Sequence, residues 1–121
     1  MKVPGPDHPI AVEPNSRRVR VTFNVEVVAE SARSLVMREK NYNPVIYIPR
    51  EDADASLLVR SNHTSHCPYK GDASYFSIRA GDRVSENAIW TYEQPYSAVA
   101  EIKGCLAFYP NRVDSIEELE K

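Results

Sequence analysis

Alternation of apolar and polar residues is the clearest pattern in the chain, and it predicts β-strands. A period of two places every second side chain on the same face of a strand, so alternation indicates a strand with one buried face. Short continuous apolar runs indicate strands buried on both faces, and a following proline ends such a strand. The alternating segments are 17–27, 73–79 and 88–92, and the apolar runs are 35–37, 45–48 and 105–109.

Helical patterns are scarce, and loops are expected between the strands. Residues 50–58 begin with acidic and end with apolar side chains, which predicts one or two helical turns with Glu51 and Asp52 near the positive end. Residues 61–71 are polar without periodicity and predict a loop. Asn24 tolerates a positive φ, but the β-branched Val25 does not. The first alternating segment is therefore either one continuous strand or a strained tight hairpin at Asn24-Val25, and both alternatives stay open.

The domain organisation predicted from these patterns is simple. Residues 1–16 contain four prolines without periodicity and predict an extended arm. Residues 17–113 predict a single β domain, and residues 114–121 predict a charged tail with weak helical tendency. We find no internal repeat and no second domain in this pattern.

Composition supports a folded β domain. The 121 residues include 9 prolines and 4 glycines, and Val and Ile outnumber Leu and Met. β-Branched side chains favour strands over helices. A hydrophobic content of 42% with a net charge of −2 argues against disorder. The near balance of 15 basic and 17 acidic residues excludes a general attraction to nucleic acid or anionic membranes, and no apolar run is long enough to span a membrane.

The two cysteines are expected to be free thiols. The opening residues lead into polar sequence rather than an apolar signal segment, so a cytoplasmic location is expected. Cys67 and Cys105 are then two thiols rather than a disulfide. Their wide spacing excludes the paired C-x-x-C knuckles of a zinc ribbon.

Candidate chemistry is concentrated in the polar segment 61–72. His63, His66 and Cys67 have the ligand types of a zinc site, but they would need a distant fourth ligand, and a surface loop with incidental histidines is the favoured interpretation. We predict no metal and no cofactor. Cys67 is also a candidate nucleophile that His63 or His66 would activate, against the alternative of a structural thiol.

Cations near this segment suggest an anion site. Lys70 and Arg50 carry the positive charges, and Gly71 lets backbone approach a ligand. Asp52 follows a predicted strand, where a carboxylate either works as an acid or base or caps the next helix. Aromatic side chains commonly line ligand pockets, although core packing of Trp90 is the competing interpretation. The predicted ligand-binding residues are Arg50, Asp52, Thr64, Lys70, Trp90 and Tyr92.

Several motifs resemble one known family. The resemblance runs from about Val19 to Tyr109, and its most specific part is the C-P-Y-K-G stretch of residues 67–71 together with the preceding Thr64. The segments that carry the resemblance are 47–52, 64–75, 88–92 and 102–109. The family is described as domain of unknown function (DUF) 427. The resemblance implies a coiled, mainly antiparallel β fold of the Mss4-like, or β-tent, group. Zinc-binding members of that group use two C-x-x-C pairs, which this chain lacks. The family often has Asn-Gly at the position of Asn24-Val25 in this chain. The resemblance implies no established activity.

These observations together predict a small cytoplasmic β domain that binds a small, anionic molecule in a polar pocket. A ligand site requires Arg50, Thr64 and Lys70 to converge on a concave surface. One alternative is a protein–protein interaction module or homodimer, which would show a broad exposed apolar patch. Another is a thiol- or His-dependent enzyme, which requires an accessible Cys67 within hydrogen-bond reach of a histidine.

Overall fold

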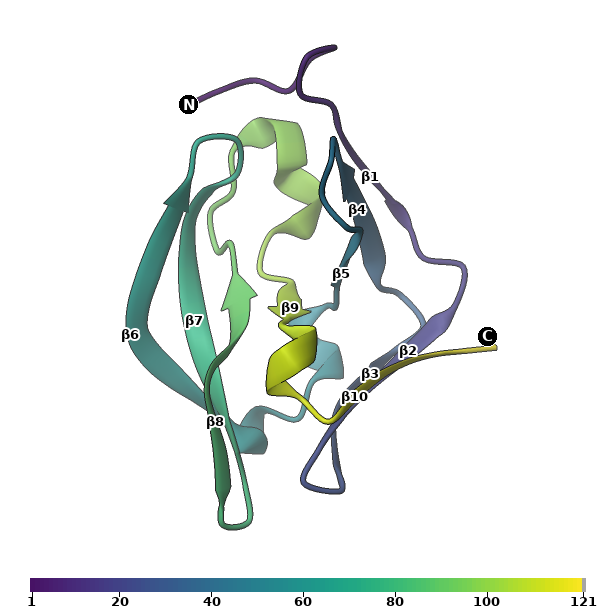
Figure 1. Cartoon of the computed structure of the whole chain (residues 1–121), viewed down its shortest axis with the longest axis vertical. Coiled ribbons are helices and arrows are strands. Elements are labelled where there is room, and N and C mark those ends of the chain that lie inside the picture. The colour runs from purple at the N-terminus through teal and green to yellow at the C-terminus, as the bar shows by residue number, and fades with distance from the viewer. Residues whose placement is uncertain (121) are drawn as a thin grey trace.

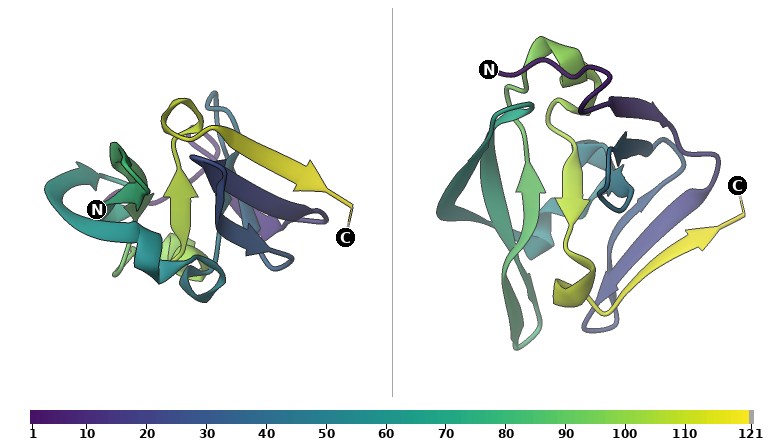
Figure 2. Two further views of the ribbon diagram at one scale, coloured as in Figure 1. Left: turned by 90° about the horizontal axis from the view of Figure 1, so that it is seen from below. Right: turned by 45° about the horizontal axis from the view of Figure 1, so that its top comes forward.

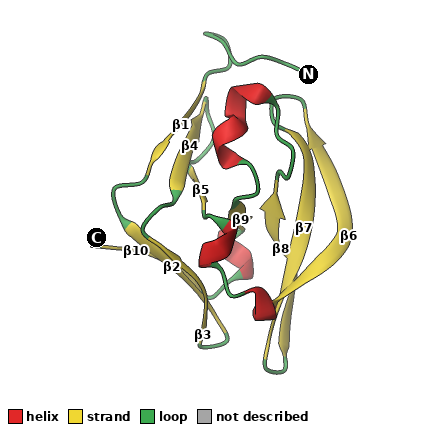
Figure 3. Ribbon diagram, turned by 180° about the vertical axis from the view of Figure 1, so that it is seen from behind, coloured by secondary structure: helices red, strands yellow, loops and turns green. Residues whose placement is uncertain are grey.

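The computed structural model describes residues 1–120, and its regular secondary structure consists of strands and short 3-10 turns (Figures 1 and 3). The mainly β prediction is confirmed. No helical segment within residues 1–120 is long and apolar enough to cross a lipid bilayer. The strands are β1 (Ile10–Pro14), β2 (Arg18–Phe23), β3 (Glu26–Ser31), β4 (Leu35–Glu39), β5 (Val45–Tyr47), β6 (Leu58–Cys67), β7 (Gly71–Ala80), β8 (Arg83–Thr91), β9 (Leu106–Phe108) and β10 (Ser115–Leu119). The 3-10 segments are η1 (Arg50–Asp52), η2 (Ala55–Leu57), η3 (Ser97–Ile102) and η4 (Pro110–Arg112).

Three antiparallel sheets make up the fold. Their strand orders are β1-β4-β5, β10-β2-β3 and β6-β7-β8-β9. The sheet with β6, β7 and β8 faces the other two, and β9 runs between them (Figures 1 and 2). Ile48, just after β5, forms an isolated bridge with Leu106 of β9, with N–H···O distances of 2.8 and 2.7 Å. This bridge joins the first sheet to the third.

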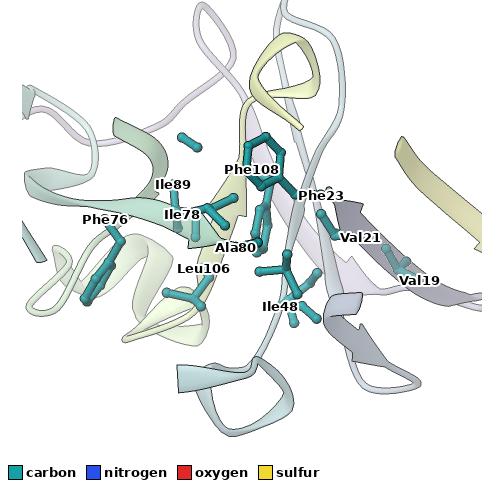
Figure 4. Packing of buried hydrophobic residues seen from close by; sticks show 13 residues of the cluster. Val19, Val21, Phe23, Ile48, Phe76, Ile78, Ala80, Ile89, Leu106 and Phe108 are labelled. Carbon is teal, nitrogen blue, oxygen red and sulfur yellow. The ribbon is translucent and has the colours of Figure 1, made fainter. Parts of the chain in front are cut away.

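The main core fills the space between the sheets. Val19, Val21 and Phe23 alternate along β2 and are all buried, as their period of two predicts. Figure 4 shows Ile48, Leu106 and Phe108 lying between the side chains of β2 and those of β7 and β8. The Val- and Ile-rich composition therefore supplies the branched side chains that pack between the pleated surfaces.

The expected loop at 61–71 is wrong for most of its length. Residues Leu58–Cys67 form β6, and only the turn before Gly71 lies outside a strand. β6 is the edge strand of its sheet, and most of its side chains are exposed. Backbone pairing with β7 holds this strand in place. Its side chains therefore need not alternate between apolar and polar, and that alternation is the pattern by which strands such as β2 are predicted.

Strands also form where we expected an arm and a tail. β1 pairs with β4, and β10 pairs with β2. In β10 the acidic Glu117 lies opposite Arg20, so the charges that suggested a solvated tail partly serve cross-strand pairing. Residue 121 of the predicted tail lies outside the described residues.

The hairpin alternative at Asn24-Val25 is correct. Both residues have positive φ, 50° and 61°, and they connect β2 to β3 as a tight turn. Asn24 is held by its neighbours, because its side-chain amide donates to Ala80 O at 2.7 Å and its backbone N–H donates to Asp114 at 2.7 Å. Val25 is 96% exposed, so its side chain gains no packing in return for the unfavourable φ.

Replacing Val25 by glycine is therefore expected to stabilise the protein by about 1 kcal/mol. A left-handed conformation costs a β-branched residue roughly 1–3 kcal/mol, and the greater unfolded-state entropy of glycine offsets part of the gain. Urea unfolding of wild type and Val25→Gly measures the difference. Val25→Ala is the control, since alanine keeps its Cβ and should gain less. A glycine variant no more stable than the alanine variant would contradict the argument.

Candidate functional site

A cavity of about 490 Å³ lies between the β1-β4-β5 sheet and the β6-β7-β8-β9 sheet. The first sheet contributes Met37, Glu39, Val45 and Tyr47 to its wall. The opposite wall comes from the turn after β6, from β7 and β8, and from residues following β8 and β9. We call this space the aromatic pocket, because seven of its lining residues are aromatic: Tyr42, Tyr47, Tyr69, Tyr75, Trp90, Tyr92 and Tyr109.

The aromatic side chains are organised by contacts with one another. The Trp90 indole N–H donates to the Tyr47 hydroxyl at 3.3 Å, and the Trp90 ring lies 4.5 Å from that of Tyr109. Burial raises the pKa of Tyr47 and of Tyr92 far above the ordinary range, and it raises the pKa of Tyr109 to about 12. These phenols stay neutral at physiological pH and offer the pocket hydrogen-bonding hydroxyls rather than charge.

A cluster of three charged or titratable side chains forms one part of the pocket wall. Lys70 Nζ donates to Glu39 Oε1 at 2.5 Å, and His8 Nε2 donates to Glu39 Oε2 at 2.6 Å. Only 12% of the Lys70 side chain and 11% of the Glu39 side chain are exposed. Burial alone would raise the pKa of Glu39, but the hydrogen bonds from Lys70 and His8 outweigh it and hold this pKa below its ordinary value. The His8 ring stacks on Tyr69 with centroids 3.9 Å apart.

The turn between β6 and β7 positions Lys70. Its backbone N–H donates to Cys67 O at 3.2 Å, and its carbonyl accepts from Tyr96 N at 2.9 Å. Gly71 follows with a φ of +111°, a conformation that side chains rarely adopt. Lys70 Nζ also lies 3.8 Å from Cys67 Sγ, and the half-buried Cys67 lines the pocket.

The structure brings together only half of the predicted ligand-binding residues. Lys70, Trp90 and Tyr92 line the aromatic pocket, whereas Arg50, Asp52 and Thr64 do not. The convergence of Arg50, Thr64 and Lys70 is therefore not observed.

Local partners explain where these three residues lie. Arg50 sits over the Phe76 ring at 4.8 Å and contacts Glu93 at 3.2 Å, outside the pocket. Asp52 accepts from Ser31 Oγ at 2.6 Å. Thr64 is exposed on the edge strand β6, opposite Ser74.

The candidate catalytic and metal-binding residues are also dispersed. His63 packs edge-on against Tyr75, and the exposed His66 contacts Asp72 at 2.7 Å. Within residues 1–120, the Cys67 thiol is within hydrogen-bond distance of Lys70 Nζ but makes no hydrogen bond to the side chain of either histidine. Across the same residues, no group of three or more His, Cys, Asp and Glu side chains is placed to hold a metal ion.

Sequence patterns missed several pocket residues. His8 lies in the segment that we expected to be an arm, and Glu39 ends a short strand without a motif around it. Tyr75 was detectable, because the alternation in 73–79 already placed it on the face opposite Phe76. Tyr47 and Tyr109 lie in segments that resemble the family, but no pattern around either residue points to a chemical role.

Comparison with known proteins identifies a family but no characterised relative. No curated protein matches the sequence. The family described as domain of unknown function (DUF427) matches residues 11–119. This range runs through all ten strands except the first residue of β1 and contains every lining residue of the aromatic pocket except His8. The chain belongs to the DUF427 family.

Proposed function

We propose that this protein binds a small organic anion with a flat or apolar body in the aromatic pocket. The observation that carries the proposal is the Lys70–Glu39–His8 cluster in the pocket wall. Buried ion pairs contribute little to stability compared with apolar side chains of similar size. The position of these charged groups beside a concave, aromatic-lined cavity therefore favours a role in binding.

The chemistry of the pocket fits such a ligand. An ammonium group has three N–H donors, and the contacts of Lys70 with residues 1–120 engage two of them, at Glu39 and Cys67. A third donor is available for a carboxylate. Lys70 and Glu39 cancel in charge, so a carboxylate would be held by the hydrogen bond that Lys70 donates rather than by a net positive charge. The flat rings of Trp90 and the tyrosines suit a planar body.

Thiol chemistry by Cys67 is a second candidate function. The observation that favours it is that Cys67 lines the same pocket, with its Sγ beside Lys70. Iodoacetamide labelling tests it, because a reactive Cys67 should label faster than a free thiol in solution. Labelling slower than that of free cysteine would count against this candidate.

The interaction-module alternative, a cytoplasmic location and the likeness to the Mss4-like group stay predictions from the sequence.

The single tryptophan makes the binding proposal measurable. Because Trp90 lies in the pocket wall, its fluorescence should respond to a bound ligand. Benzoate, neutral benzamide and cationic benzylamine have similar bodies and differ in charge. We expect benzoate to bind about tenfold or more tightly than the other two, since a hydrogen bond to a charged group contributes roughly 1.5–3 kcal/mol.

Two cation variants complete this experiment. Lys70→Met should weaken benzoate binding about tenfold or more, whereas Arg50→Met removes a cation outside the pocket and should leave it unchanged. Circular dichroism checks that both variants fold. Equal affinity for benzoate and benzylamine, or equal effects of the two substitutions, would refute the anion site.

A further inference from the structure

A second cavity, of about 430 Å³, adjoins the aromatic pocket. We call it the apolar cleft, since Asn43 contributes the one polar side chain among its lining residues in the described part of the chain. Its floor consists of core side chains, among them Val21, Ile48 and Phe108, and half-buried Ile46 and Ile116 lie at its rim. The half-buried rim side chains thus expose apolar surface, and no charged side chain among the lining residues could hold a polar ligand.

The two cavities share part of their walls. Asn43, Val45 and Trp90 line both of them. Val45 and Trp90 are half-buried and Asn43 is exposed, so this shared wall is not sealed inside the core. The indole N–H of Trp90 donates to Tyr47, a residue of the aromatic pocket, so the polar edge of the ring is directed there. A polar, charged space therefore adjoins an apolar one at these shared residues.

We infer that the apolar cleft receives the alkyl tail of the same ligand whose anionic head binds beside Lys70, so that the ligand is an amphiphilic carboxylate. This inference rests on the proposed function and specifies its ligand class. Burying an alkyl chain is favourable in proportion to the apolar area removed from water. A polar extension would lose its hydration in the cleft and find no charged partner there.

A series of benzoates with alkyl chains of increasing length at the para position tests the inference. Each methylene that enters the cleft should lower Kd roughly two- to fourfold until the cleft is filled. A para-linked ether chain of equal length should bind no better than benzoate. Calorimetry gives the Kd values independently of Trp90. Benzoate binding without any gain from alkyl chains would overturn the inference and leave the proposed function intact.

A variant that fills the cleft locates the tail. Ile116→Trp places a large side chain at the rim and should abolish the gain with chain length, while benzoate itself binds within about twofold of wild type. Val84→Trp is the matched control, because Val84 is an exposed strand valine that lines neither cavity. Ile116→Phe is the milder substitution if circular dichroism shows that the tryptophan variant is unfolded. A gain that persists in a folded Ile116 variant would overturn the inference.

One further probe separates this inference from the proposed function. If benzoate fails to bind, the proposed anion site is wrong, and 1-heptanol then tests the cleft alone. Heptanol binding that Ile116→Trp or Ile116→Phe removes would support an alkyl site in the cleft. Absence of heptanol binding to the wild-type protein would overturn it.

Discussion

Leu106→Ala is expected to lower the free energy of unfolding by about 3–4 kcal/mol. Leu106 is fully buried in the main core, where its side chain packs with Ile48 and Phe76. Truncating a buried leucine loses its transfer free energy and leaves a cavity, which together cost roughly 2.7–5 kcal/mol. The site is poorly able to collapse, because β9 is held by pairing with β8 on one side and with Ile48 on the other.

A second leucine provides the control for this prediction. Leu119 is half-buried at the end of β10, an edge strand, so Leu119→Ala should cost about 1 kcal/mol or less. Urea unfolding at fixed pH measures both variants. Equal costs at the two positions would show that Leu106 does not hold the sheets together as the packing indicates.

Strands with one buried face were predictable, and strands without one were not. β2 was recognised because Val19, Val21 and Phe23 alternate with polar residues and enter the core. β6 was not, because it is an edge strand with polar side chains on both faces and depends on backbone pairing with β7. The order of apolar and polar side chains along the sequence does not show which strands will pair through their backbones.

The same limit explains the partial prediction of the site. Lys70 and Cys67 adjoin one another in a motif-rich segment, so local sequence was enough to find them. Glu39 lies 31 positions from both Lys70 and His8, and only the pairing of β1 with β4 and the turn after β6 bring the three together. The charge of Arg50 suggests an anion site, but Glu93 and the Phe76 ring hold this side chain outside the pocket.

Glu39→Gln is expected to lower the free energy of unfolding by about 2–3 kcal/mol at neutral pH. The substitution removes the charge that faces the ammonium group of Lys70, whose side chain is only 12% exposed. Leaving a buried cation without its partner costs roughly 3–5 kcal/mol, and partial access to water reduces this. The control is Glu13→Gln, which breaks the exposed pair with Arg38 on the neighbouring strand. That pair should contribute less than about 0.5 kcal/mol.

The pH dependence of the same variant distinguishes loss of charge from loss of packing. The pKa of folded Glu39 lies below its ordinary value of 4.5, because the hydrogen bonds from Lys70 and His8 outweigh burial. A carboxylate with a lowered folded pKa stabilises the protein above its unfolded pKa, and this contribution is lost as the pH falls through the folded pKa. The stability gap between wild type and Glu39→Gln should therefore shrink below pH 4.5. A gap that stayed constant down to about pH 3 would show that the carboxylate charge is not what holds Lys70 and His8 at the pocket wall.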